Sequence, residues 1–144
     1  MEFDFVGDRE SEKFVETSRK ILADAKKYSF HYDGLKFFFL LLIGNAIYDV
    51  NKTVNHYIVF NSCGWAIMLD MPDFVEVKYI FVYPEHRRKG FFTCLLTLLK
   101  QEKKEIVVCT RESVMLKALV ARGFQLNGRT VDETELKFIL NVNI

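Results

Sequence analysis

Apolar residues recur along this chain with two different spacings, and segments with one spacing alternate with segments that have the other. Apolar residues three or four positions apart predict helices, whereas alternating or β-branched runs between turn residues predict strands. Strands are expected at 1–6, 53–60, 65–69, 74–83, 106–109, 124–126 and 135–141. Helices are expected at 8–27, 91–104 and 110–122 and in the aromatic-rich segment that follows Asp33-Gly34. This order predicts an α/β fold in which the strands between 53 and 83 form an antiparallel meander.

The most apolar segment is the run at 37–43, which reads FFFLLLI. Gly44, Asn45 and Asp49 interrupt it well before the ~20 apolar residues that a membrane-spanning helix requires. We therefore expect a buried helix or strand here, and no membrane partner. A contact with a membrane surface or with a second copy of the chain, giving a homodimer, remains open as an alternative.

Length and composition limit the kinds of protein that this chain can be. Its 144 residues, half of them apolar, fit one domain (1–144) with a substantial core. The formal net charge of +1 offers no general attraction to nucleic acid or to an anionic membrane. Cys63, Cys94 and Cys109 are odd in number and far apart, and the N-terminus lacks the pattern of a signal peptide. These features favour a reducing, cytoplasmic setting.

The segment 75–99 carries the most specific chemical signal. A strand-forming run stops at Pro84, a basic turn with Arg87, Arg88, Lys89 and Gly90 follows, and a helical pattern then begins. The free N–H groups and the dipole of a helix N-terminus attract phosphate, and a glycine allows a ligand to approach the main chain closely. The turn therefore predicts a site for a ligand that carries a pyrophosphate.

Together with the order of elements, this turn resembles the GNAT family of N-acetyltransferases, whose acyl-CoA signature is Q/R-x-x-G-x-G/A. The resemblance rests on Val82-Tyr83-Pro84 before Arg87-Arg88-Lys89-Gly90-Phe91-Phe92, on Cys63-Gly64-Trp65-Ala66-Ile67-Met68, and on the segment from Leu119 to Gly123-Phe124. It implies a GNAT-type fold: a central mixed, mostly antiparallel sheet of about seven strands with helices on both faces.

The resemblance also implies where a cofactor would bind. In that family acyl-CoA lies in a V-shaped gap between the fourth and fifth strands. Main-chain groups of Ile80, Phe81 and Val82 would align the pantetheine arm. The turn formed by Arg87, Arg88, Lys89, Gly90, Phe91 and Phe92 would surround the pyrophosphate. Acetyl-CoA or another acyl-CoA is thus the expected co-substrate. No metal is expected, because His31, His56 and His86 lack neighbours of the metal-binding kind in the sequence.

The implied reaction is transfer of an acyl group from acyl-CoA to a primary amine by direct attack. A primary amine has a pKa near ~10.4 and must lose a proton before it attacks. Glu76 stands before Arg87 at the spacing at which some family members place their general base. Apolar neighbours could raise its pKa, but Glu76 could equally face solvent or pair with Lys78. The N–H of Val82 is a candidate donor to the oxyanion.

Two positions depart from the family pattern. Leu119 stands where many members have a tyrosine that protonates the leaving thiolate; the candidate substitutes are Tyr79, Tyr83, Cys109 and Ser113. Phe92 stands where the signature has glycine or alanine, and its ring either enters the pyrophosphate cleft or packs in the core beside Leu96. These departures favour the alternative function, a degenerate GNAT fold that acts as a CoA-binding or protein-interaction module without turnover. No motif identifies the amine acceptor.

Overall fold

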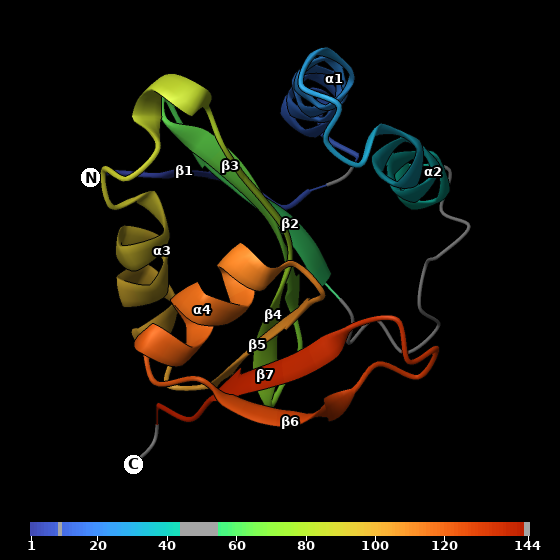
Figure 1. Ribbon diagram of the computed structural model, residues 1–144. Helices are drawn as coiled ribbons and strands as arrows, with labels where there is room; N and C mark the ends of the chain where they lie inside the picture. Colours follow the sequence, from blue (N-terminus) through green and yellow to red (C-terminus); the bar gives the residue numbers. More distant parts are fainter. Residues whose placement is uncertain (9, 44–54, 143–144) are drawn as a thin grey trace.

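The computed structural model describes residues 1–8, 10–43 and 55–142 as a seven-stranded sheet with helices on both faces (Figure 1). The strands are β1 (Asp4–Val6), β2 (Asn55–Asn61), β3 (Gly64–Asp70), β4 (Phe74–Val82), β5 (Glu105–Thr110), β6 (Gln125–Arg129) and β7 (Leu136–Leu140). The helices are α1 (Glu12–Lys27), α2 (Tyr32–Ile43), α3 (Phe91–Lys100) and α4 (Ser113–Ala121), with a 3₁₀ helix, η1, at Pro84–His86. The predicted order of elements is confirmed. The expected start of the second strand, Thr53, lies outside the described residues.

The sheet has the strand order β1-β2-β3-β4-β5-β7-β6. β4 and β5 are parallel, and every other neighbouring pair is antiparallel, so the sheet is mixed and mostly antiparallel as predicted. Parallel pairing of β4 with β5 requires a crossover, which α3 supplies. The helix between these two strands thereby places its N-terminus near the end of β4.

The core is divided by the sheet into two layers because successive side chains of a strand point to opposite faces. On β3, Trp65 and Ile67 pack under α1 and α2, whereas Ala66 and Met68 pack under α3 and α4. The first layer includes Phe14, Ile21, Leu35 and Phe39 from its helices, and the second includes Phe91, Leu95, Leu99 and Leu119.

Several element boundaries differ from the predictions: α3 ends at Lys100 and not at Lys104, and β6 runs on to Arg129. Local hydrogen bonds decide two others. α1 begins at Glu12 and not at Asp8, since the Ser11 hydroxyl accepts a hydrogen bond from the Phe14 N–H and caps the helix. α4 begins at Ser113 and not at Thr110. Thr110 ends β5, and its hydroxyl accepts a hydrogen bond from the Glu112 N–H at 3.1 Å.

The aromatic-rich segment is a helix with one buried face. α2 begins at Tyr32, so Asp33 and Gly34, expected to precede it, lie in its first turn. The buried residues of α2 are Leu35, Phe39 and Leu42, whereas Phe37, Leu40 and Ile43 are exposed. The expectation of a buried helix is thus correct for one face. Among residues 1–8, 10–43 and 55–142, no helix has the length and apolar character needed to cross a membrane.

The β4 strand contains an irregularity that shapes the site. Tyr79 lies opposite Ile67 of β3 and Val77 lies opposite Met68, so Lys78 is an extra residue, a β-bulge. The pairing of β4 with β5 runs from Phe74 to Val77 and ends there. Beyond the bulge, β4 continues along β3 while β5 takes another path, and the two strands separate.

Candidate functional site

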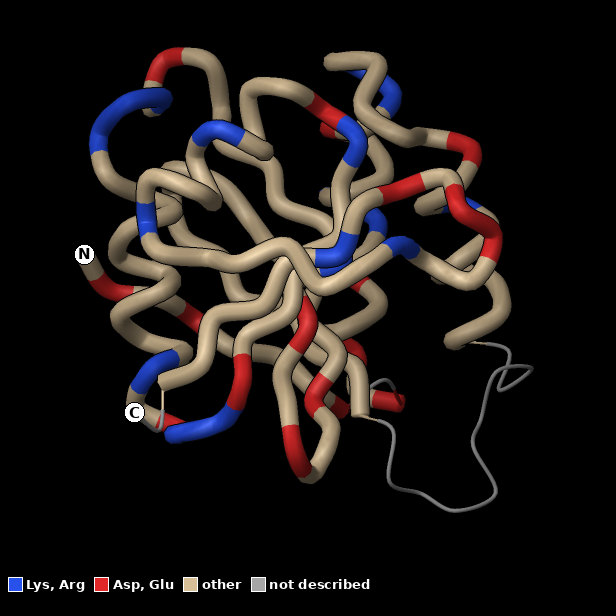
Figure 2. The backbone as a smooth tube through the Cα atoms, turned by 60° about the horizontal axis from the view of Figure 1, so that its bottom comes forward, with Lys and Arg blue, Asp and Glu red and all other residues tan. Residues whose placement is uncertain are grey.

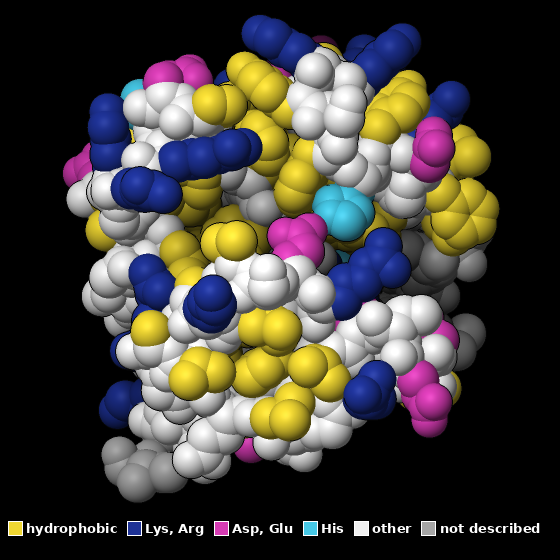
Figure 3. Space-filling model, in the orientation of Figure 1, with side chains coloured by type: hydrophobic (Ala, Val, Ile, Leu, Met, Phe, Trp, Pro, Cys, Tyr) yellow, Lys and Arg dark blue, Asp and Glu magenta, His cyan; other side chains and the backbone are white. Residues whose placement is uncertain are grey.

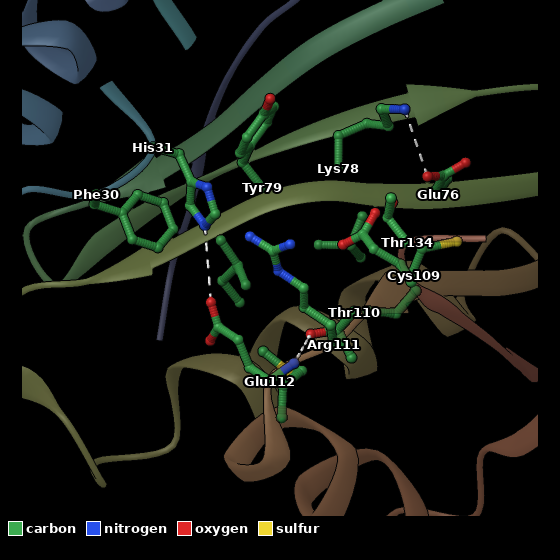
Figure 4. Close-up of a pocket in the computed structure, with 15 residues that line it drawn as sticks. Phe30, His31, Glu76, Lys78, Tyr79, Cys109, Thr110, Arg111, Glu112 and Thr134 are labelled. Carbon is green, nitrogen blue, oxygen red and sulfur yellow. Dashed lines mark hydrogen bonds and ion pairs between the residues drawn. The ribbon is translucent and has the colours of Figure 1, made fainter. Parts of the chain in front are cut away.

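A cavity of about 390 Å³ lies where β4 and β5 separate (Figure 4). Its wall comes from the bulged part of β4, the end of β5, the connection between α1 and α2, the start of α4, and the chain before β7. The lining residues are Phe30, His31, Glu76, Val77, Lys78, Tyr79, Ile80, Val108, Cys109, Thr110, Arg111, Glu112, Met115, Thr134 and Glu135. In the space-filling view the surface is hollowed beneath α1 and α2, with a histidine beside an acidic side chain (Figure 3). The gap between the fourth and fifth strands that the resemblance implies is therefore present.

Glu76, the predicted general base, lines this cavity. Its carboxylate lies 3.6 Å from the Lys78 ammonium, and its side chain is 18% exposed. The structure thus combines two of the interpretations made from the sequence, since Glu76 faces the cleft and is also paired with Lys78. An ion pair with a partly exposed lysine contributes little to stability.

His31 and Glu112 face each other across the cavity. Figure 4 shows the two side chains reaching toward one another, with Arg111 extending into the space beside them. The His31 Nε2 lies 3.8 Å from a carboxylate oxygen of Glu112, and both side chains are about half exposed or more. The contact joins the α1–α2 connection to the start of α4 over the opening between the strands.

The basic turn leads directly into α3. Gly90 is the N-cap residue with φ of 90°, and its carbonyl accepts the first helical hydrogen bond, from the Cys94 N–H at 2.9 Å. The N–H groups of Phe91, Phe92 and Thr93 therefore have no acceptor within the helix. Because Gly90 has no side chain to cap them, these donors are available to an anion.

Arg87, Arg88 and Lys89 are exposed, but they are not equivalent. The Arg87 Nε–H donates a hydrogen bond to the Val82 carbonyl at 3.0 Å, and its guanidinium lies over the Phe81 ring. Arg87 therefore holds the turn in place by contacts with the end of β4. Figure 2 shows that basic and acidic positions are interspersed over the rest of the chain, in keeping with its balanced charge.

The two phenylalanines after Gly90 have different surroundings. Phe91 is buried and contacts the Phe3 ring edge to face at 5.5 Å. Phe92 is partly buried against the core layer that contains Leu96, and the Arg122 guanidinium lies 5.1 Å above its ring. Of the two placements expected for Phe92, the structure has core packing, with Arg122 of the chain after α4 covering the ring.

Comparison with known proteins identifies the fold. No protein-family model matches this sequence, and no curated protein matches it. Solved structures do match over nearly the whole chain. A GNAT-family protein from Desulfovibrio desulfuricans is 11% identical, with 98% of this chain and 99% of that chain covered and a TM-score of 0.65.

The PaiA N-acetyltransferase from Thermoplasma acidophilum, solved with coenzyme A, is 13% identical, with 98% and 99% covered and a TM-score of 0.62. A GNAT acetyltransferase from Staphylococcus aureus Mu50 has 13% identity, the same coverage and a TM-score of 0.61. This chain has the GNAT fold.

In this GNAT fold the main chain of β4 presents its polar groups alternately to β3 and to the gap. The Phe81 carbonyl lies against Gly64 of β3, and the Tyr83 N–H donates to the Cys63 carbonyl. By alternation, the peptide groups of Ile80 and Val82 face the gap. Of the three β4 residues expected to hold a pantetheine arm, Phe81 thus directs its peptide group toward β3.

Proton donors are distributed unevenly around the GNAT cleft. Leu119 is fully buried. The Tyr83 hydroxyl donates a hydrogen bond to Asp24 at 2.5 Å, on the α1 side of the sheet. Ser113 is exposed and does not line the cavity. Tyr79 and Cys109 do line it, so the structure retains these two of the four predicted substitutes.

Tyr79 and Cys109 both stay protonated at neutral pH. Burial, and then the negative charge of Glu135, raises the pKa of Tyr79 above its ordinary value. Burial, followed by the charges of Glu76 and Glu135, raises the pKa of Cys109 to about 11. Each group is therefore a hydrogen-bond donor in the cleft and not a nucleophilic anion.

Glu135 is a cleft residue that the sequence did not single out. It was expected only as the first residue of the last strand, and it lies just before β7. Because β7 is antiparallel to β5, with Leu136 opposite Thr110, Glu135 reaches the end of β5 where the cavity opens. Burial raises its pKa, opposed by the positive charges of Lys78 and Arg111. Among the described residues, no three His, Cys, Asp or Glu side chains are grouped as a metal site would require.

Proposed function

We propose that this protein transfers an acetyl or other acyl group from acyl-CoA to a primary amine. One observation carries the proposal: the gap between β4 and β5 opens beside a β-bulge, and β4 itself continues into a turn and a helix N-terminus whose N–H groups have no side-chain cap. A thioester on a long arm with a pyrophosphate at its other end matches both features. The coenzyme A complex of the Thermoplasma protein with the same fold supports this choice.

In the proposed complex, the N–H groups of Phe91, Phe92 and Thr93 bind the pyrophosphate. Gly90 leaves room for the phosphate oxygens, and the exposed Arg88 and Lys89 add positive charge. The pantetheine arm lies along the gap-facing peptide groups of Ile80 and Val82, beside Phe81, in the manner of an added strand.

The proposed reaction proceeds by direct attack. Glu76 takes a proton from the acceptor ammonium, and the free amine attacks the thioester carbonyl, forming a C–N bond. The gap-facing N–H of Val82 stabilises the oxyanion of the tetrahedral intermediate. The C–S bond then breaks, and the CoA thiolate leaves with a proton donated by Tyr79 or Cys109. The acylated nitrogen loses its second proton to solvent, from which the donor is reprotonated. Because a thiolate is a good leaving group, loss of this donor slows the reaction but does not stop it.

A second candidate function is binding without turnover. Its support is the buried Leu119 at the position of the family's usual acid, and Phe92 in place of a small residue. The two functions are distinguished by calorimetric titration with CoA and acetyl-CoA, combined with a thiol-release assay over a panel of primary amines. Release of CoA that depends on an amine supports the enzyme. CoA binding without amine-dependent release supports the CoA-binding module. Absence of CoA binding refutes both the enzyme and the CoA-binding module and leaves only a protein-interaction module.

A further inference from the structure

The cavity has one wall that suits the apolar body of a small molecule. Phe30 and His31 pack edge to face with ring centroids 4.7 Å apart, and His31 lies at 5.9 Å from Tyr79 in the same manner. All three residues line the cavity. Phe30 and His31 come from the connection between α1 and α2, and Tyr79 of β4 packs with the core layer under these helices. Their rings offer both apolar surface and π-faces that attract cations.

The carboxylates in the rest of the wall differ in whether a side chain of the protein already lies against them. Glu76 is paired with Lys78 at 3.6 Å and Glu112 with His31 at 3.8 Å. For the carboxylate of Glu135, the described part of the chain offers no ion pair and no hydrogen bond. Among the three acids that line the cavity in the described chain, Glu135 is therefore the one whose carboxylate is not engaged by another side chain.

The charges around Glu135 come from three elements. Lys78 and Glu76 of β4 act on it, Arg111 acts on it from the end of β5, and Asp132 acts on it from its own loop. Lys78 is engaged by Glu76, and Arg111 is exposed and too far for an ion pair with Glu135. The partial desolvation of Glu135 makes an added cation favourable, since a charge-assisted hydrogen bond is stronger where water is reduced.

We propose that Glu135 binds the acceptor as an ammonium ion, and that the cleft therefore selects primary amines that are cationic at neutral pH and carry an aromatic or apolar body. The inference rests on the proposed function for its biological meaning. Weakly basic aromatic amines and neutral alcohols lack the positive charge, so they are excluded as acceptors. Glu135 fixes the acceptor nitrogen at the end of β5, and Glu76 then removes its proton.

Equilibrium binding of 2-phenylethylamine tests the ammonium site without requiring turnover, and 2-phenylethanol is the uncharged control ligand. The variant is Glu135→Gln, which keeps the side-chain size. The matched control is Glu133→Gln, which removes the same charge from the same loop at an exposed residue that does not line the cavity. Thermal melting checks that both variants fold.

We expect the wild type and Glu133→Gln to bind the amine more tightly than the alcohol. In Glu135→Gln, amine affinity should fall by about tenfold or more, corresponding to ~1.4 kcal/mol, while affinities for the alcohol and for CoA stay unchanged. In the acyl-transfer assay, Glu135→Gln should raise the amine KM about tenfold and change kcat less than about threefold. Wild-type-like amine binding by Glu135→Gln, or no preference of the wild type for the amine, overturns the proposal.

Failure of the proposed function has a different signature. Amine binding that depends on Glu135, without release of CoA from acetyl-CoA, refutes acyl transfer and leaves the ammonium site standing. Amine-dependent CoA release that Glu135→Gln leaves unchanged in KM refutes the ammonium site and leaves acyl transfer standing.

Discussion

Gly90 and Gly128 form a matched pair that isolates the anion site at the start of α3. Both have left-handed backbone angles, with φ of 90° and 89°. At either position an added Cβ would meet no neighbouring atom of the described residues within 4 Å. An alanine in this region costs about 1–2 kcal/mol, so each variant should lower the Tm by roughly 2–8 °C for a chain of this length.

Only Gly90→Ala places a methyl group beside the free N–H groups of the first turn of α3. We expect its CoA affinity, measured by calorimetric titration, to fall by about tenfold or more, or ~1.4 kcal/mol. Gly128→Ala should bind CoA like the wild type in spite of an equal loss of Tm. Arg88→Ala removes one exposed charge worth at most ~1 kcal/mol, so it should lower CoA affinity less than Gly90→Ala does. Equal CoA affinities for Gly90→Ala and Gly128→Ala would refute the placement of the pyrophosphate.

Three further predictions concern the cleft and its surroundings. Glu76→Gln should lower the acyl-transfer rate by ~10²-fold or more with nearly unchanged CoA affinity, and an unchanged pH–rate profile would remove Glu76 from the mechanism. Phe92→Ala should lower the free energy of unfolding by ~1–3 kcal/mol in a denaturant titration without strengthening CoA binding, because the ring packs on the core. A marked gain in CoA affinity would instead place that ring in the cleft. Because the pKa of Cys109 is raised to about 11, its thiolate fraction grows as the pH rises toward that value. In a chain with Cys63→Ser and Cys94→Ser, iodoacetamide labelling of Cys109 should therefore keep accelerating beyond pH ~9, and a plateau near the ordinary thiol pKa would contradict this.

The sequence alone predicted the parts of this protein that depend on short stretches of chain. The order of helices and strands follows from apolar spacing, and the turn between β4 and α3 follows from Pro84 and Gly90. The mixed sheet order was reached through the family resemblance, since many sheets are compatible with the same order of elements.

Tertiary structure decided which side chains share the cleft. The sequence did not mark Glu135 as a cleft residue, since it was only the first residue of an expected strand. It reaches the cavity only through the pairing of β7 with β5. The bulge at Lys78 depends on the register of β4 against β3. Likewise, the contact of Arg122 with Phe92 joins the chain after α4 to the first turn of α3. Spacing along a chain determines which face of an element is apolar, but strand register and helix packing over long sequence separations determine which polar groups meet.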